Sequence, residues 1–301
     1  MLLTGAAGWV GRSLLERLVL EGFQVLAVDR SRVDVPAGAG GITWHEEDAA
    51  DVAALRGLIG ATNLGHVIHA ATVTASPDET PRATMNYLAG HLAMASAALE
   101  LAVEAGASAT FISSAAVFAA DQQAPLDEDA QTHGVGPYAT AKRAAELMWL
   151  EAARAGAIAQ VVRLGNLFGP GESESLTRPR KSLVGRYVDA AQREGRIVVE
   201  QPRAIREWTW LPDVAGVIVT SLQRGPETPL IHAVAPEHVT DLQLANHVSK
   251  AFPGTMVESA DMSAAGPRPP MISRTPTVID VPWTPLEKGL SMMLPMRAKP
   301  A

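Results

Sequence analysis

The sequence contains no cysteine in its 301 residues. It therefore has no disulfides, no thiolate metal site and no cysteine nucleophile, and its redox compartment stays open. Basic residues are also outnumbered, with 25 Lys and Arg against 32 Asp and Glu and a formal net charge of −7. This balance gives no electrostatic surface for nucleic acid or for an anionic membrane.

Long apolar runs are missing as well. No run reaches the ~20 residues that a membrane-spanning helix needs. The opening MLLTGAAGWVG has no basic region followed by a long apolar stretch, which is the pattern of a secretory signal. We therefore expect a cytoplasmic protein with neither a membrane nor a nucleic acid as partner.

What the sequence does contain is an alternation of short apolar runs and longer helical patterns over its first two-thirds. This alternation predicts an α/β fold with a Rossmann-type, doubly wound parallel sheet. The predicted strands are Met1–Thr4, Gln24–Asp29, Ile42–His45, His66–Ala70, Thr110–Ser113 and Gln160–Leu164. The predicted helices lie near Val10–Glu21, Asp51–Ile59, Thr84–Ala105 and Tyr138–Ala155.

Three glycines, in the segment TGAAGWVG, follow the first predicted strand and open a helix. Gly5 permits a tight turn, Gly8 lets the backbone approach a pyrophosphate, and Gly11 lets helix and strand pack closely. The first helical residues, Trp9 and Val10, add free N–H groups and a partial positive charge that favour phosphate. The turn therefore predicts a dinucleotide site.

Asp29 ends the second predicted strand, 18 residues after the last of these glycines. A carboxylate about 20 residues on is expected to bind the adenosine ribose. It favours NAD, because it repels the 2′-phosphate of NADP. Arg30 and Arg32 are either solvated loop charges or partners of that phosphate, so NADP stays as the less favoured cofactor. Asp48, followed by Ala49, is either an adenine contact or a loop or capping acid.

After Gly165 the pattern becomes irregular. A polar stretch, Glu172–Lys181, leads into predicted helices at Ser182–Glu194 and Asp213–Gln223, and Gly and Pro punctuate the tail. We expect a dinucleotide-binding domain over residues 1–165 and a smaller, substrate-binding C-terminal domain that takes up most of residues 166–301. Some later segments are expected to return to the first domain.

Tyr138 and Lys142 lie four residues apart on a predicted helix, hence on one face. A phenol that titrates near ~10 is a poor base at neutral pH, and a nearby cation stabilises its phenolate. Ser113-Ser114 ends the fifth predicted strand, at the carboxyl edge of the sheet where α/β proteins bind ligands, so a serine hydroxyl is expected beside the pair. A Tyr–Lys pair alone is most often a surface feature. With the glycine turn, Asp29 and this serine, the pair predicts proton transfer at a carbinol carbon during hydride transfer.

These residues together resemble the extended branch of the short-chain dehydrogenase/reductase superfamily, which contains NAD-dependent epimerases and dehydratases. TGAAGWVG matches the family's T-G-x-x-G-x-x-G. SSAAVF at 113–118 matches the strand that bears the catalytic Ser or Thr, and this match points to Ser114 rather than Ser113. HAA at 69–71, RLGNLFGPG at 163–171, REWTWLPDVA at 206–215 and WTPLEKGL at 283–290 match further family segments. The resemblance covers almost the whole chain.

The resemblance implies further site residues. Ala70, Ala71 and Asn86 would contact the cofactor, as would Tyr138 and Lys142. The residues implied for the substrate are Ser114, Ala115, Tyr138, Asn166, Arg206 and Arg268. Both arginines match positions that bind a substrate diphosphate, with a salt bridge at the domain junction as the alternative.

Departures from the family pattern narrow the range of reactions that we expect this chain to catalyse. Ala115 and Ala116 follow Ser114 where the family's 4,6-dehydratases have an acidic residue, and the cysteine of its epimerase-reductases is absent. The tail between Arg268 and Trp283 is shorter than usual, which removes a segment that helps to close a nucleotide-sugar site. A 4-epimerase or 4-keto reductase of a nucleotide-linked sugar remains. The alternatives are an NAD-dependent dehydrogenase of a free sugar, sugar acid or other small secondary alcohol and, more remotely, a non-enzymatic dinucleotide sensor.

Other sequence patterns indicate structural roles rather than catalytic or metal-binding ones. His66 and His69 point to opposite faces of a strand, so we expect no metal. Trp208 and Trp210 alternate on a predicted strand, which favours core packing over a pocket wall. The helix Thr84–Ala105 is apolar on more than one face, so it needs more than one partner surface. Because the family's dimers pair this helix and the Tyr–Lys helix with their mates, we expect a homodimer.

Overall fold

The short apolar runs form a parallel sheet in the computed structural model, which describes residues 1–33, 40–60, 63–123, 125–259 and 269–294. Within these residues the sheet has seven strands, in the order β10-β6-β5-β4-β1-β2-β3. The strands are β1 (Leu2–Thr4), β2 (Val25–Asp29), β3 (Ile42–Glu46), β4 (His66–His69), β5 (Ser108–Ser114), β6 (Ala159–Leu164) and β10 (Leu230–Ala233). Most of them are continuously buried, as expected for a sheet with helices on both faces.

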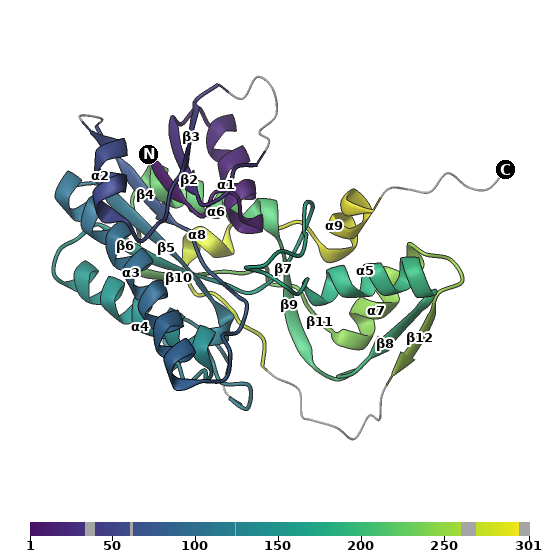
Figure 1. The fold of residues 1–301 in the computed structure, drawn as a ribbon. Coiled ribbons are helices and arrows are strands. Elements are labelled where there is room, and N and C mark those ends of the chain that lie inside the picture. The colour runs from purple at the N-terminus through teal and green to yellow at the C-terminus, as the bar shows by residue number, and fades with distance from the viewer. Residues whose placement is uncertain (34–39, 61–62, 124, 260–268, 295–301) are drawn as a thin grey trace.

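Helices cover both faces of this sheet (Figure 1). One core joins α1 and α6 to one face, and a second core joins α2, α3 and α4 to the other. Their bounds are α1 (Trp9–Leu20), α2 (Val52–Ile59), α3 (Pro81–Ala105), α4 (Pro137–Arg154) and α6 (Leu211–Arg224), with the short α8 (Pro276–Ile279) packed against α6 and β10. The predicted Rossmann-type doubly wound fold is confirmed.

The strand order reverses beside β1. The chain runs from β1 outward to β2 and β3, then returns to the other side of β1 for β4, β5 and β6. The loops at the carboxyl ends diverge at this point and leave a crevice for a ligand. Asp29 and Ser114 end β2 and β5 at this same edge.

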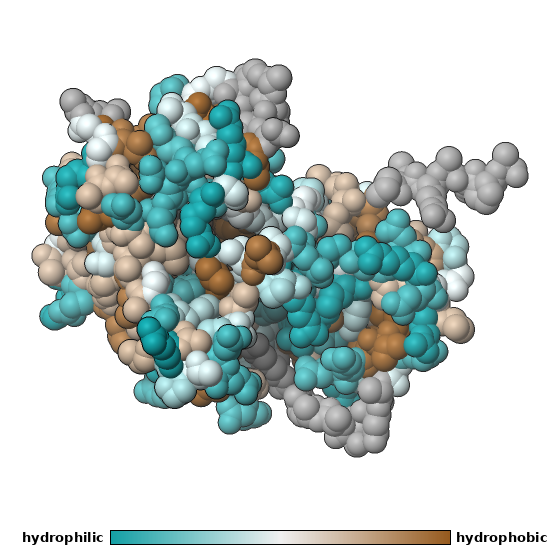
Figure 2. Space-filling view, in the orientation of Figure 1, coloured by the Kyte–Doolittle hydropathy of each residue, from teal (hydrophilic) through white to brown (hydrophobic). Residues whose placement is uncertain are grey.

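The helix α3 begins three residues before its predicted start. Thr80 caps it, since its hydroxyl accepts a hydrogen bond from the Ala83 N–H, and Pro81 occupies the first turn. By length and composition α3 is apolar enough to cross a membrane, but its inner face packs on β4 and β5 and it also contacts α2 and α4. In Figure 2 weakly hydrophobic side chains cover much of the left side of the larger lobe, over α3 and α4.

A smaller unit follows β6. Its core lies between α5, α7, α9 and two small sheets, one of order β11-β9-β7 and one that pairs β12 with β8. The bounds are β7 (Asn166–Phe168), α5 (Leu183–Glu194), β8 (Arg196–Val199), β9 (Ile205–Trp210), β11 (His238–Thr240), α7 (Asp241–Lys250), β12 (Met256–Ser259) and α9 (Leu286–Met293). Trp208 and Trp210 are both buried in this core. The smaller unit is built from three segments of the chain, namely β7 to β9, β11 to β12, and α9. Between the first two segments α6 and β10 return to the large sheet, and α8 does so before α9.

Candidate functional site

A cavity of about 560 Å³ opens at the carboxyl edge of the large sheet. Most of the residues predicted for the cofactor line it, although they come from distant parts of the sequence. They are Gly5, Gly8, Trp9, Val10, Gly11, Asp29, Arg30, Asp48, Ala49, Ala70, Ala71, Tyr138 and Lys142. We call this space the large pocket.

The glycine turn forms one wall of the large pocket, and its shape depends on two glycines. Gly5 has φ +76°, and a Cβ there would meet the backbone of Ala71 at 2.4 Å. A Cβ on Gly11 would lie 2.0 Å from the Gly5 carbonyl oxygen. Neither position tolerates a side chain, so the turn holds the start of α1 tightly against β1 and β4.

Asp29 closes the far end of the glycine turn. One carboxylate oxygen accepts a hydrogen bond from the Ala7 N–H at 3.1 Å, and the other accepts from the Ser31 N–H at 3.3 Å. Arg30 also lines the pocket, whereas Arg32 is exposed and does not. Asp48 accepts from the Ala50 N–H at 2.9 Å, the geometry of a loop acid, while still lining the pocket.

Ser114, Tyr138 and Lys142 meet inside the same pocket. Tyr138 and Lys142 lie one turn apart on α4, with the lysine Nζ 5.9 Å from the centroid of the tyrosine ring. Ser114 reaches them from the end of β5. Burial raises the pKa of Tyr138, while the hydroxyls of Ser114 and Thr72 and the charge of Arg178 act in the opposite direction.

Lys142 is almost fully buried, at 3% exposure. Its Nζ donates to the Ile112 carbonyl at 2.8 Å and lies 4.8 Å from the centroid of the Phe111 ring. Burial lowers the pKa of Lys142 to about 7, and the charge of Glu146 opposes that shift. The lysine can therefore gain or lose a proton near neutral pH.

A network of buried polar side chains lies next to Lys142 on α4. Glu146 lies one turn after Lys142 on α4 and accepts two hydrogen bonds from the Arg163 guanidinium, both at 2.9 Å. It also accepts from the Ser113 hydroxyl at 2.6 Å. Arg163 contacts His232 of β10 at 3.2 Å. The network joins α4 to the ends of β5, β6 and β10, so it fixes the helix face that presents Tyr138 and Lys142.

A second cavity of about 470 Å³ lies in the smaller unit, and we call it the arginine pocket. Asn166 lines both cavities, and Glu207 holds it, since its carboxylate accepts hydrogen bonds from the Asn166 backbone N–H at 3.1 Å and side-chain Nδ2 at 2.9 Å. The arginine pocket is lined by four arginines, Arg180, Arg186, Arg196 and Arg206, together with Glu194, Glu200 and Asp241.

Two of these arginines differ in how their charge is balanced. Arg206 donates to both carboxylate oxygens of Asp241, at 2.7 and 3.0 Å. Burial opposes its charge, but the Asp241 carboxylate raises the pKa of Arg206. Burial lowers the pKa of Arg186, and so does the positive charge of Arg180. The pocket therefore carries repelling cations as well as a paired one.

Four predicted positions do not meet in the large pocket. Asn86 is exposed on α3 and lines neither cavity, because Tyr87 and His91 occupy the helix face directed inward. Ala115 packs beside the small core of Val117 and Phe118 rather than lining either cavity. Arg206 lines the arginine pocket. Arg268 lies outside the described residues.

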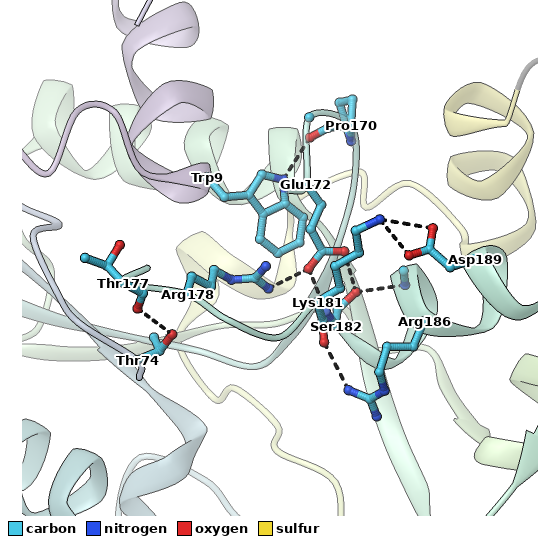
Figure 3. A network of polar contacts seen from close by, with 12 residues as sticks. Trp9, Thr74, Pro170, Glu172, Thr177, Arg178, Lys181, Ser182, Arg186 and Asp189 are labelled. Atoms are coloured by element: carbon cyan, nitrogen blue, oxygen red, sulfur yellow. Dashed lines mark hydrogen bonds and ion pairs between the residues drawn. The ribbon is translucent and has the colours of Figure 1, made fainter. Parts of the chain in front are cut away.

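The polar stretch after β7 supplies site residues that local patterns missed. Ser173, Ser175, Thr177, Arg178 and Ser182 all line the large pocket. Figure 3 shows how polar contacts hold this stretch beside Trp9 and Thr74. Its position in the sequence was a usable signal, because the stretch comes shortly after the predicted strand Gln160–Leu164, whose carboxyl end lies at the ligand-binding edge of the large sheet.

Comparisons with known proteins agree with this geometry. Residues 1–233 match the model of the NAD dependent epimerase/dehydratase family. A UDP-glucose 4-epimerase of Cyamopsis tetragonoloba is 28% identical over 156 residues, which are 47% of this chain and only 44% of that protein's length.

Solved structures share the fold. A UDP-glucose 4-epimerase of Thermotoga maritima, solved with UDP-glucose, superposes with a TM-score of 0.79 at 19% identity, covering 97% of this chain and 96% of its own. An NAD dependent NDP-hexosamine 5,6-dehydratase involved in tunicamycin biosynthesis superposes with a TM-score of 0.78 at 22% identity, covering 97% of this chain and 95% of its own. Because the family model matches residues 1–233, the chain belongs to the NAD dependent epimerase/dehydratase family of enzymes.

Proposed function

We propose that this enzyme uses NAD to act on a secondary hydroxyl or keto group of a nucleotide-linked sugar, as a 4-epimerase or a 4-keto reductase. One observation carries the proposal. The large pocket, which contains Ser114, Tyr138 and Lys142, adjoins the arginine pocket through Asn166. A sugar beside Tyr138 would thus have its charged nucleotide among the arginines.

The residues of the large pocket fit a dinucleotide. Gly8 lines the large pocket, and a Cβ there would lie 3.2 Å from the Gly5 carbonyl oxygen, a tight contact. A pyrophosphate would lie beside this glycine at the N-terminus of α1. Asp29 would accept from the adenosine ribose, and Asp48 and Ala49 would lie beside the adenine. Bound NAD would supply the hydride acceptor through its nicotinamide ring.

The catalytic roles follow from the positions of three side chains. Ser114 would orient the substrate oxygen by a hydrogen bond, and Tyr138 would exchange a proton with it. Lys142, protonated, would stabilise the phenolate of Tyr138 and bring its pKa toward neutrality. Because burial lowers the pKa of Lys142 to about 7, an anion or phenolate nearby is needed to keep it charged at neutral pH.

The substrate diphosphate would bind in the arginine pocket. Arg180 and Arg186 repel one another there, so an anion between them would relieve the repulsion. Asn166 would contact the substrate where the two cavities meet. Arg206 and, as the family resemblance implies, Arg268 would be the remaining residues that bind the diphosphate. Ala115 and Ala116 offer no acid for 4,6-dehydration, which leaves epimerisation or keto reduction.

A second function is favoured by one specific observation. Arg206 is already neutralised by Asp241, so it has less charge to offer a diphosphate. An NAD-dependent dehydrogenase of a free sugar, sugar acid or other small secondary alcohol would not need that charge. It would release NADH after each turnover, whereas an epimerase would keep its cofactor.

We also propose a homodimer in which α3 and α4 pair with their mates. Met85 and Val103 are 63% and 57% exposed and lie 18 residues apart on α3, which is five helical turns and hence one face. Leu147 of α4 is 70% exposed. A dimer would cover this outer face.

The test combines a binding and a turnover measurement. UDP- and dTDP-linked sugars should raise the melting temperature, since a ligand at a hundredfold excess over its Kd stabilises by about 2.7 kcal/mol. Tyr138→Phe should lower turnover by about 10²–10⁴-fold and leave NAD affinity nearly unchanged. NADH production from a free sugar, with no response to any sugar nucleotide, would instead support the dehydrogenase. A Tyr138→Phe variant with normal turnover would overturn the assigned proton transfer.

A further inference from the structure

The polar segment Pro170–Ser182, between β7 and α5, crosses the large pocket, and we call it the strap. One end is fastened to the dinucleotide turn. The Trp9 indole Nε1 donates to the Pro170 carbonyl at 2.8 Å, and Arg12 donates to the Gly171 carbonyl at 2.6 Å. The strap is thus bonded to the first turn of α1, the expected phosphate site.

The middle of the strap is fastened to the opposite wall. The Thr177 carbonyl accepts hydrogen bonds from the backbone N–H groups of Thr74 and Ala75, at 2.8 and 3.1 Å. The Thr74 hydroxyl donates to the same carbonyl at 3.1 Å (Figure 3). Thr74 belongs to the segment after β4, so the strap joins the two walls between which a dinucleotide would lie.

Arg178 projects from the strap over Trp9. Its guanidinium carbon lies 4.7 Å from the centroid of the indole, and its Nη2 donates to Glu172. Glu172 is fixed in turn, because it accepts from the Ser182 backbone N–H at 2.7 Å and from the Ser182 hydroxyl at 2.8 Å. The guanidinium is therefore oriented by a stacking contact on one side and by a held carboxylate on the other (Figure 3).

One nitrogen of this oriented group lacks an acceptor. Nη1 of Arg178 is buried and has no hydrogen-bond partner among the described residues. A buried donor left without an acceptor is energetically unfavourable, so the arrangement calls for a ligand. Arg178 lines the large pocket together with the glycine turn and is close enough to Tyr138 for its charge to act on that phenol.

We propose that Nη1 of Arg178 donates to the pyrophosphate of bound NAD, which makes the strap part of the cofactor site. The pyrophosphate is the anion expected at the start of α1, where Trp9 holds the guanidinium. The inference rests on the proposed function only for the identity of the dinucleotide. It has a kinetic consequence: loss of the bonds at Pro170, Gly171 or Thr177 should speed the dissociation of NAD.

The first experiment compares three ligands by calorimetry, namely NAD, ADP-ribose and adenosine. Arg178→Gln should weaken NAD and ADP-ribose, which both contain a pyrophosphate, by about ten- to a hundredfold, as expected for a hydrogen bond to a charged group. Adenosine, measured by competition, should bind as to the wild type. Arg193→Gln, an exposed arginine on α5 outside both pockets, should leave all three affinities unchanged.

The second experiment measures NAD dissociation by stopped flow. Trp9→Phe keeps an aromatic ring under Arg178 but removes the hydrogen bond to Pro170, so NAD should dissociate several-fold faster. Unchanged NAD and ADP-ribose affinity in Arg178→Gln would overturn the proposal. Equal weakening of adenosine would also overturn it, since that would show a general distortion of the site.

These outcomes are separate from the test of the proposed function, because no substrate is present. Pyrophosphate-dependent loss in Arg178→Gln together with no turnover of any sugar nucleotide would keep this inference and discard the proposed substrate. Normal sugar-nucleotide turnover with an unchanged Kd for NAD in Arg178→Gln would do the reverse.

Discussion

At the scale of single residues, Lys142, Glu146 and Arg163 are charged side chains that are buried and have few partners. Lys142 is 3% exposed and Glu146 is 2% exposed. A buried ion pair such as Glu146 with Arg163 adds little to stability over apolar residues of the same size, but loss of one partner strands the other charge. The effect of the Glu146–Arg163 pair is to hold α4 in a fixed register against β5 and β6.

The first prediction concerns Lys142 and the pH dependence of stability. Its pKa is lowered by burial from 10.5 to about 7 in the folded chain. Between those values the unfolded chain binds a proton that the folded chain does not, so stability should rise with pH by up to about 1.4 kcal/mol per unit. Lys142→Met should flatten this rise. Urea midpoints at pH 7, 8 and 9 measure it, and parallel curves for the two proteins would contradict the burial argument.

The second prediction concerns Asp29 and cofactor choice. Two like charges about 4 Å apart repel by about 1–4 kcal/mol between water and a protein surface. Asp29→Asn should therefore improve NADP affinity by on the order of tenfold and leave NAD weaker or unchanged. Calorimetric titration of both cofactors decides it. Arg30→Gln is the matched comparison: if that variant alone changes NADP affinity, Arg30 and not Asp29 governs the choice.

At the scale of elements, α3 and α4 share two tasks. Their inner faces pack on β4, β5 and β6, and α4 carries the Tyr138–Lys142 face to the large pocket. Their outer faces leave Met85, Val103 and Leu147 exposed. The apolar breadth that makes α3 resemble a membrane helix thus has one part in the core and one part on the exposed face, which the proposed homodimer would cover.

The third prediction follows for the assembly of the chain. Light scattering at micromolar concentration should give about twice the chain mass of 31.7 kDa. Met85→Glu combined with Leu147→Glu should give a monomer, because two charges would be buried without partners at the interface. Leu20→Glu is the control, since Leu20 is 82% exposed on α1, on the opposite side of the sheet. A wild-type monomer would leave the α3 face without a partner.

At the scale of the whole molecule, neutral histidines connect its layers. His69 hydrogen-bonds the Thr4 hydroxyl of β1 at 2.8 Å and stacks on Phe111 of β5. His91 packs between Tyr87 and Tyr138. Burial lowers the pKa of His69 to about 3 and of His91 to about 4, with the charge of Lys142 contributing to both.

The fourth prediction is acid sensitivity. Below pH 6.5 the unfolded chain protonates these histidines and the folded chain does not, so stability should fall as the pH drops from 6.5 toward 4, by up to about 1.4 kcal/mol per unit for each. His69→Asn should lessen the slope, whereas the exposed His133→Asn should not. Melting temperatures across this range measure it, and an equal slope in His69→Asn would refute the role of that histidine.

The sequence alone determined the parts of this protein that depend on local spacing. The glycine turn, Asp29 at the end of β2, the pair Ser113-Ser114 at the end of β5 and the Tyr138–Lys142 face all follow from helix and strand periods and from the carboxyl edge of a parallel sheet. Each of those positions lines the large pocket. The choice of Ser114 over Ser113 came from the family resemblance. The strands β1 to β6 and the helices α1 to α4 were predicted with shifts of a few residues at their ends, because caps such as Thr80 decide where a helix begins. The strand β10 and the helix α8 were not predicted.

Only the tertiary structure decided which distant residues meet. Arg178 stacks on Trp9 although 169 residues separate them in the chain, and Asp241 occupies the guanidinium of Arg206 from the start of α7. Helix phase turned Asn86 outward, and the apolar face of α6 joined the first core rather than the second. Such contacts follow from packing between elements, which local periodicity does not encode, so the strap and the arginine pocket became visible only once the chain was folded.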